Sequence, residues 1–148
     1  MSRADDAIRM FDQEFSCAQS VFTAFADPAL VNRETALRLA AGFGGGLARS
    51  GETCGAVTGA VLALGLRRCG APAEDPQAKL ASYPAVQEFL ARFRALHGSI
   101  TCRELLGADL GTPEGRRRSQ EEGLVRRRCP AFVRDAARIV EDLLEPAS

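Results

Sequence analysis

The chain is poor in the residues that most enzyme motifs use. Among its 148 residues it has no tryptophan, one tyrosine and one histidine, His97. It contains no phosphate-binding loop of the G-x-x-x-x-G-K-[ST] type, no dinucleotide fingerprint and no Cys-x-x-Cys. Without Cys-x-x-Cys-His, we expect no covalent c-type haem. No specific enzymatic reaction therefore follows from the motifs, and we expect His97 to serve as a cation at a helix C-terminus.

The chain also lacks net charge and long apolar runs. Its 19 basic and 19 acidic residues give a formal charge of +0, so we expect no nucleic acid partner. The longest apolar stretch, 54–66, is too short to span a bilayer, and we expect no membrane insertion. The N-terminus is acidic where a signal peptide is basic, which predicts a cytoplasmic protein. The arginine clusters 116–118 and 126–128 are expected either to be solvated or to dock an acidic redox partner. The sequence is compatible with a monomer and with a homo-oligomer.

Apolar residues recur at spacings of three and four, and no segment alternates as a β-strand does. The sequence therefore predicts an all-α fold: one compact bundle of about five or six helices, with residues 1–148 forming a single domain. Gly- and Pro-rich segments predict loop excursions near 67–84 and 108–128. The expected helices cover residues 6–25, 32–41, 54–66, 86–97, 102–106 and 130–144.

Five cysteines in a reducing compartment favour metal binding, redox chemistry or burial as small hydrophobes. Cys54, Cys102 and Cys129 are each expected at or just before a helix start, where amide groups and the helix dipole favour a thiolate. Cys17 is expected within the first helix, on the flank of its apolar stripe. Cys69 falls in an expected loop.

A glycine run precedes the second cysteine. Gly44, Gly45 and Gly46 are expected to present backbone N–H groups to bound sulfur or an anion, and Gly55 to keep side chains away from Cys54. For Gly59, we expect a role in close helix packing and not in the cysteine site. The nearby Arg49 and Glu52 either tune a thiol or are solvated.

Two segments carry a family resemblance: Phe15-Ser16-Cys17-Ala18-Gln19, and the stretch 51–60, which reads GETCGAVTGA. With two later single cysteines, this pattern resembles the C_GCAxxG_C_C family of redox-active proteins over nearly the whole chain. The resemblance implies that Cys17, Cys54, Cys102 and Cys129 are the functional cysteines and that Cys69 is not. Related domains occur in haem-containing cytochromes that also carry iron–sulfur centres, which implies electron transfer or thiol redox chemistry.

Four thiols from separate helices suit an iron–sulfur cluster, a zinc ion or two dithiol pairs. Our first expectation is a metal or iron–sulfur centre held by Cys17, Cys54, Cys102 and Cys129, because four thiolates without a cation repel each other. The alternatives are a metal-free thiol/disulfide redox module with a redox protein partner, a zinc-stabilised structural or interaction domain, and inert buried cysteines.

Overall fold

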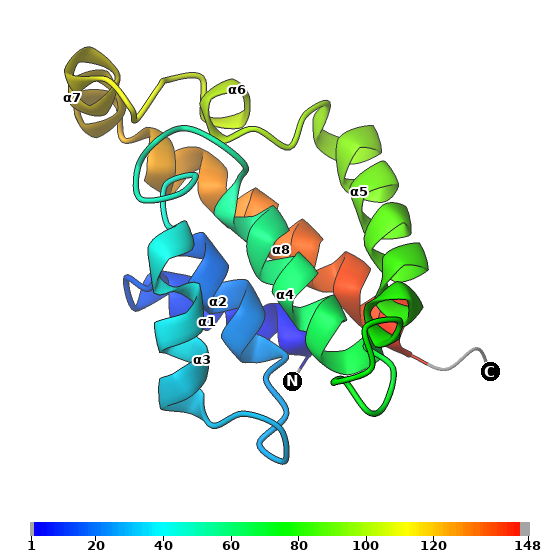
Figure 1. The fold of residues 1–148 in the computed structure, drawn as a ribbon. Helices are drawn as coiled ribbons and strands as arrows, with labels where there is room; N and C mark the ends of the chain where they lie inside the picture. Colours follow the sequence, from blue (N-terminus) through cyan, green and yellow to red (C-terminus); the bar gives the residue numbers. More distant parts are fainter. Residues whose placement is uncertain (1, 146–148) are drawn as a thin grey trace.

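The computed structural model describes residues 2–145, which form eight α-helices and two short 3₁₀ helices and contain no β-strand (Figure 1). The all-α class is confirmed, whereas the expected five or six helices were too few. The elements are α1 (Arg3–Asp12), α2 (Cys17–Ala24), α3 (Arg33–Ala40), η1 (Ala41–Phe43), α4 (Gly55–Arg68), η2 (Ala78–Ser82), α5 (Tyr83–His97), α6 (Cys102–Leu106), α7 (Pro113–Glu122) and α8 (Leu124–Leu144).

The first expected helix is divided into α1 and α2. Glu14 lies in the left-handed region at φ 73°, which a continuous right-handed helix cannot contain. Ser16 then starts α2: its hydroxyl accepts a hydrogen bond from the Gln19 amide, while the Gln19 side chain accepts one from the Ser16 amide. Cys17 is consequently the first residue of α2, and its expected place in mid-helix was wrong.

The last helix begins six residues before Pro130, its expected start. Gly123, in the left-handed region at φ 62°, ends α7 and begins α8, so Pro130 lies inside α8. The loop expected near 108–128 thus contains the whole of α7, which Thr112 caps. The loop expected near 67–84 is shorter than its predicted range, because α4 continues to Arg68 and η2 follows.

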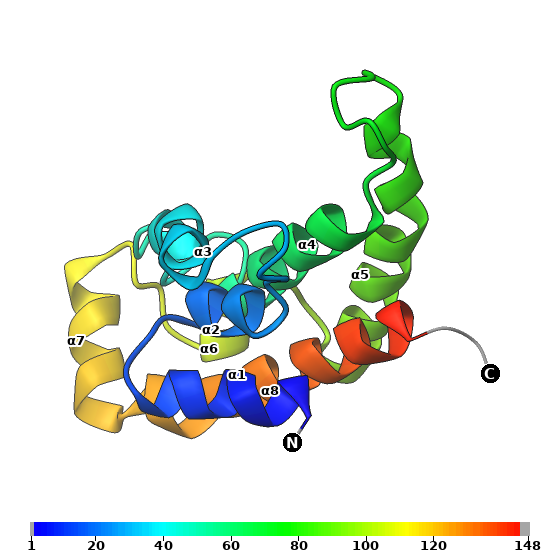
Figure 2. The same cartoon turned by 90° about the horizontal axis from the view of Figure 1, so that it is seen from below.

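Helix α4 lies at the centre of the fold and packs against α2, α5 and α8, while α1 runs beside α8 (Figures 1 and 2). Small residues allow α2 and α4 to approach closely. A Cβ atom added to Gly59 would lie 2.7 Å from the carbonyl oxygen of Ala18. The packing role expected for Gly59 is therefore confirmed.

Two clusters of buried apolar side chains lie on either side of the cysteines. The larger contains residues of α1, α2, α3, α4, α5, α6 and α8 and includes Cys54, with Cys17 and Cys129 packed against it. The smaller consists of Leu106, Ala108, Leu110 and Leu124, with Cys102 and Cys129 packed against it. No helix within residues 2–145 has both the length and the apolar character needed to cross a membrane.

Candidate functional site

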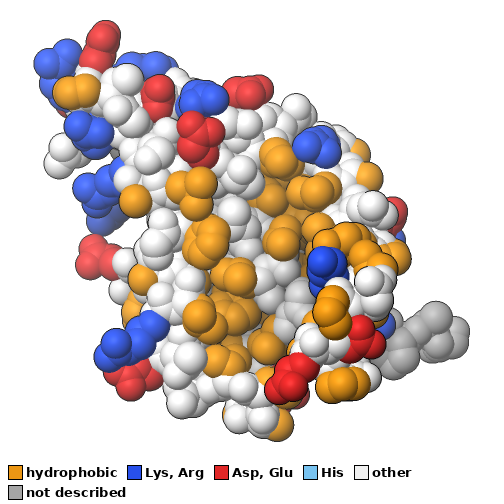
Figure 3. All heavy atoms as spheres, in the orientation of Figure 1, with side chains coloured by type: hydrophobic (Ala, Val, Ile, Leu, Met, Phe, Trp, Pro, Cys, Tyr) orange, Lys and Arg blue, Asp and Glu red, His pale blue; other side chains and the backbone are white. Residues whose placement is uncertain are grey.

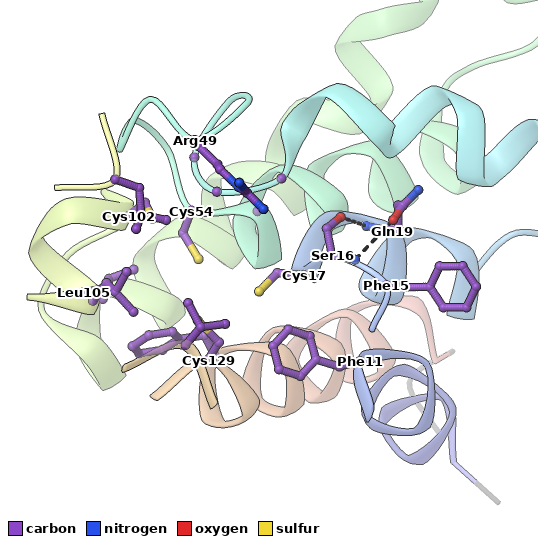
Figure 4. A pocket seen from close by; sticks show the side chains of 18 of the residues that line it. Phe11, Phe15, Ser16, Cys17, Gln19, Arg49, Cys54, Cys102, Leu105 and Cys129 are labelled. Atoms are coloured by element: carbon purple, nitrogen blue, oxygen red, sulfur yellow. Dashed lines mark hydrogen bonds between the residues drawn. The ribbon is translucent and has the colours of Figure 1, made fainter. Parts of the chain in front are cut away.

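One open cavity of about 1080 Å³ is lined by four of the five cysteines (Figure 4). Cys17 comes from the start of α2, Cys54 from the residue before α4, Cys102 from the start of α6 and Cys129 from α8. Figure 4 shows the sulfur atoms of Cys17 and Cys54 directed into the same space. Cys69 is exposed at the far end of α4 and does not line this cavity.

A short antiparallel bridge between Thr53 and Thr101 brings two of the cysteines together. The amide of Cys54 donates a hydrogen bond to the carbonyl of Ile100 at 2.7 Å, and the amide of Cys102 donates one to the carbonyl of Glu52 at 2.6 Å. The helices α4 and α6 therefore begin side by side. The Thr-Cys dipeptide occurs at both helix starts, and neither helix has a side-chain hydrogen bond at its N-cap.

The other two cysteines, Cys17 and Cys129, lie close enough to shift each other's pKa. The hydrogen bond with Cys129, together with burial, raises the pKa of Cys17 well above its ordinary value. The same hydrogen bond lowers the pKa of Cys129, although burial opposes the shift. Of these two thiols, Cys129 is therefore the one that ionises more readily, while Cys17 beside it stays protonated.

Burial decides the pKa of the remaining two thiols. It raises the pKa of Cys54 to about 12, although the amides of Ala56 and Val57 hydrogen-bond to the sulfur and favour the thiolate. The pKa of Cys102 rises to about 11, chiefly through burial and through the charge of Cys129.

The expected placement at helix starts is confirmed for Cys54 and Cys102 and wrong for Cys129. The expected lowering of the pKa at helix starts is overturned, because the cost of desolvation exceeds the helix-terminal effect.

The glycine run leads into an unusual turn. Residues 45–49 all have positive φ values, between 50° and 68°, and form one turn of left-handed backbone. Three of these residues carry side chains, each of which costs about 1–2 kcal/mol in this conformation. The turn is closed by a hydrogen bond of 2.9 Å from the Arg49 amide to the Gly44 carbonyl.

Three of the glycines have positions that exclude a side chain. A Cβ atom added to Gly46 would lie 2.7 Å from the Cβ of Cys102, and one added to Gly55 would lie 3.2 Å from the Cβ of Cys17. A Cβ atom on Gly45 would lie 2.8 Å from Arg49 of its own turn. The glycines thus let the loop and α4 approach the cysteines. Binding of a cofactor by Gly44, Gly45, Gly46 and Gly55 stays a prediction.

Two other candidate residues lie outside the cysteine cavity. Glu52 forms a surface ion pair with Arg103 at 3.5 Å. His97 ends α5 as expected, but its side chain is largely buried, with Nε2 3.0 Å from Oδ2 of Asp135. Its ring contacts Phe132, which does line the cavity, at a centroid distance of 5.0 Å. Arg49, in contrast, lines the cavity beside the cysteines.

The four thiols do not fit a single metal ion in this arrangement. A tetrahedral zinc ion holds its thiolate ligands at about 2.3 Å, so the four sulfur atoms must crowd around one point. Within residues 2–145, no group of three or more His, Cys, Asp or Glu side chains is placed to hold one metal ion.

Comparison with known proteins supports the family resemblance that the cysteine pattern indicated. The family described as "Putative redox-active protein (C_GCAxxG_C_C)" matches residues 15–143. A search of curated proteins and a search of solved structures both found no match. The matched range begins just before α2 and contains all four cavity cysteines. The chain therefore belongs to the C_GCAxxG_C_C family.

Proposed function

We propose that the chain is a thiol–disulfide redox protein in which Cys17 and Cys129 alternate between a dithiol and a disulfide. The proposal rests on the position of both thiols in the lining of one cavity, together with the opposite shifts of their pKa values. A thiolate beside a protonated thiol is the arrangement that disulfide exchange requires, since one sulfur attacks and the other completes the reaction. The pair faces an open cavity, through which the sulfur of a reaction partner can reach it.

The reaction has two balanced steps. The Cys129 thiolate attacks one sulfur of a partner disulfide; the partner's S–S bond breaks, its other sulfur leaves as a thiolate, and a mixed disulfide forms. Cys17 then loses its proton and attacks the sulfur of Cys129, and the second partner sulfur leaves. Two electrons pass to the partner, whose two sulfurs take up one proton from Cys17 and one from solvent.

Because their pKa values are raised, Cys54 and Cys102 are expected to react with a disulfide more slowly than Cys129 does. With pKa values of about 12 and about 11, both thiols stay protonated near neutral pH. Only the thiolate is a good nucleophile. Cys129 is therefore the first of the four to react.

The test is to identify the disulfide that forms. The reduced protein is equilibrated in dithiothreitol redox buffers of increasing potential, remaining thiols are alkylated, and linked peptides are identified by mass spectrometry. We expect a Cys17–Cys129 disulfide that forms reversibly and persists in Cys54→Ala and Cys69→Ser. Irreversible oxidation, or pairing that uses Cys69, would overturn the proposal.

The second candidate function is electron transfer by an iron–sulfur cluster. The observation in its favour is that all four thiols line one cavity, a donor set that suits several irons even though it does not fit one ion. Cys17, Cys54, Cys102 and Cys129 would hold the cluster, which would supply one-electron chemistry. Anaerobic purification, iron and sulfide analysis and visible absorption test this candidate. Colourless, iron-free protein after reconstitution with iron and sulfide contradicts it.

A further inference from the structure

A second cavity, of about 770 Å³, adjoins the cysteine cavity. The two share four lining residues, Arg49, Leu110, Val125 and Arg126. The lining of the second cavity also includes Arg116 and Arg117 from α7 and contains no acidic residue. We call this second space the arginine cavity. Four arginines from three separate parts of the chain therefore surround one hollow.

The positive charges of the arginine cavity are not compensated within the described residues. There, the side chains of Arg49, Arg117 and Arg126 make no ion pair and no hydrogen bond. Arg116 donates a hydrogen bond of 2.8 Å to the carbonyl of Leu110, which leaves its charge unpaired. Like charges that face one hollow repel each other, and a bound anion removes this repulsion.

Helix periodicity separates the arginines of α7 from its acids. Pro113, Arg116, Arg117 and Gln120 recur at spacings of three and four and line the arginine cavity. The acidic residues of α7 are absent from this lining, and Glu122 pairs instead with Arg118 at 2.8 Å. The fold thus keeps the acidic residues of α7 out of the lining of the arginine cavity. Figure 3 shows basic side chains at the corner of the molecule that α7 forms, with acidic side chains between them.

We propose that the two cavities form one binding site for a small anionic thiol or disulfide. The arginine cavity binds its carboxylate or phosphate groups, and its sulfur reaches Cys129. Val125, Arg126 and Cys129 lie three and four residues apart on one face of α8, so an arginine and the reactive thiol are neighbours on the same surface. Arginine suits the role because its planar donor fork matches both anions. The anion site stands independently, whereas the substrate class rests on the proposed thiol–disulfide function.

The first experiment measures anion binding without sulfur chemistry. Inorganic pyrophosphate and S-methylglutathione, neither of which can exchange disulfides, are titrated into the reduced protein by calorimetry at low and high salt. We expect at least one probe to bind, and its affinity to fall about tenfold in Arg117→Gln and in Arg126→Gln. The tighter probe identifies phosphate or carboxylate as the preferred group.

Arg118→Gln is the matched control, because Arg118 belongs to the same helix but lies outside the arginine cavity. Its affinity for both probes is expected to equal that of the unaltered protein. Binding of neither probe would overturn the anion site. Equal losses in Arg117→Gln and Arg118→Gln would also overturn it, since only general surface charge would then act.

The second experiment tests the substrate class by kinetics. The rate of Cys129 oxidation is compared for glutathione disulfide, which is anionic, and hydroxyethyl disulfide, which is neutral. We expect the ratio of the two rates to fall about tenfold in Arg126→Gln and to stay unchanged in Arg118→Gln. An unchanged ratio in Arg126→Gln overturns the substrate class. Absence of any Cys17–Cys129 disulfide, with anion binding intact, instead identifies a failure of the proposed function alone.

Discussion

Replacing Cys17 with alanine removes the thiol that hydrogen-bonds to Cys129 while leaving Cys129 in place. A hydrogen bond to a charged group contributes about 1.5–3 kcal/mol. Because about 1.4 kcal/mol corresponds to a tenfold change in an ionisation equilibrium, the pKa of Cys129 should rise and its thiolate fraction should fall at least about tenfold at a given pH below that pKa. The remaining effect on Cys129 is burial, which acts in the same upward direction. The alanine variant should therefore lose most of its Cys129 thiolate near neutral pH.

The assay is the pH dependence of alkylation. The reduced protein is treated with iodoacetamide at a series of pH values, and the modification of Cys129 is followed by mass spectrometry of its peptide. The rate rises with the thiolate fraction, so the midpoint of the curve gives the pKa of Cys129. Cys54 serves as an internal reference, since its raised pKa predicts slow labelling throughout the neutral range.

Cys17→Ser is the informative comparison for the alanine variant. A serine hydroxyl still donates a hydrogen bond but cannot form a disulfide, so the Cys129 midpoint should shift less than in Cys17→Ala. Equal midpoints in the unaltered protein and in both variants would refute the reasoning. They would show that the Cys17 thiol does not stabilise the Cys129 thiolate.

Three further predictions concern stability and pH. Gly59→Ala should lower the free energy of unfolding by about 1–3 kcal/mol, because the added methyl group is overpacked against Ala18. Gly65→Ala should raise the free energy of unfolding by about 0.5–1 kcal/mol, because Gly65 lies in a helix with open space around it. Urea denaturation measures both changes. Gly46→Ala combines a positive φ with a Cβ atom 2.7 Å from backbone, and a loss under about 1 kcal/mol would contradict the close approach. The pKa of Cys54 is raised from 9.0 to about 12, so its contribution to stability is present below pH 9 and lost as pH rises toward 12. Thermal unfolding across this range should show a smaller alkaline loss in Cys54→Ala.

The helical class could be predicted because it depends on local periodicity, but the boundary between α1 and α2 could not. The apolar spacing continues from Phe11 to Phe22 across the break, so the periodicity gives no sign of it. The available signal was Ser16 followed three residues later by Gln19, which is the spacing of a capping box. Reading that signal would have placed Cys17 at a helix start.

The start of α8 was missed for a different reason. Proline inside a helix removes one hydrogen bond and costs about 3 kcal/mol, so a helix start near Pro130 was the reasonable expectation. Tertiary contacts outweigh that preference: Leu124 is buried in the smaller cluster, and the Arg128 side chain donates a hydrogen bond of 2.9 Å to the carbonyl of Leu106. A single sequence contains no record of these distant contacts.

The four cysteines that the sequence singled out line one cavity, but the physical reason given for their reactivity was wrong. We expected helix starts to produce thiolates, and the two thiols that remain at helix starts next to the bridge have raised pKa values. The lowered pKa belongs to Cys129, in the second turn of α8, because Cys17 from a distant part of the chain interacts with it. Pairing between side chains, which depends on the tertiary fold, therefore decides which thiol reacts.

The different pKa values of the four thiols also predict different pH dependences for the two candidate functions. Loading a cluster on all four cysteines must displace protons from Cys17, Cys54 and Cys102, whose pKa values are all raised. Cluster assembly should therefore become steeply more favourable as pH rises. Disulfide exchange needs only the Cys129 thiolate to begin, so its rate should level off once Cys129 has ionised. Measuring iron incorporation and disulfide formation on one protein over one pH range tests both: a cluster yield independent of pH would mean that the thiols are not protonated as the structure indicates.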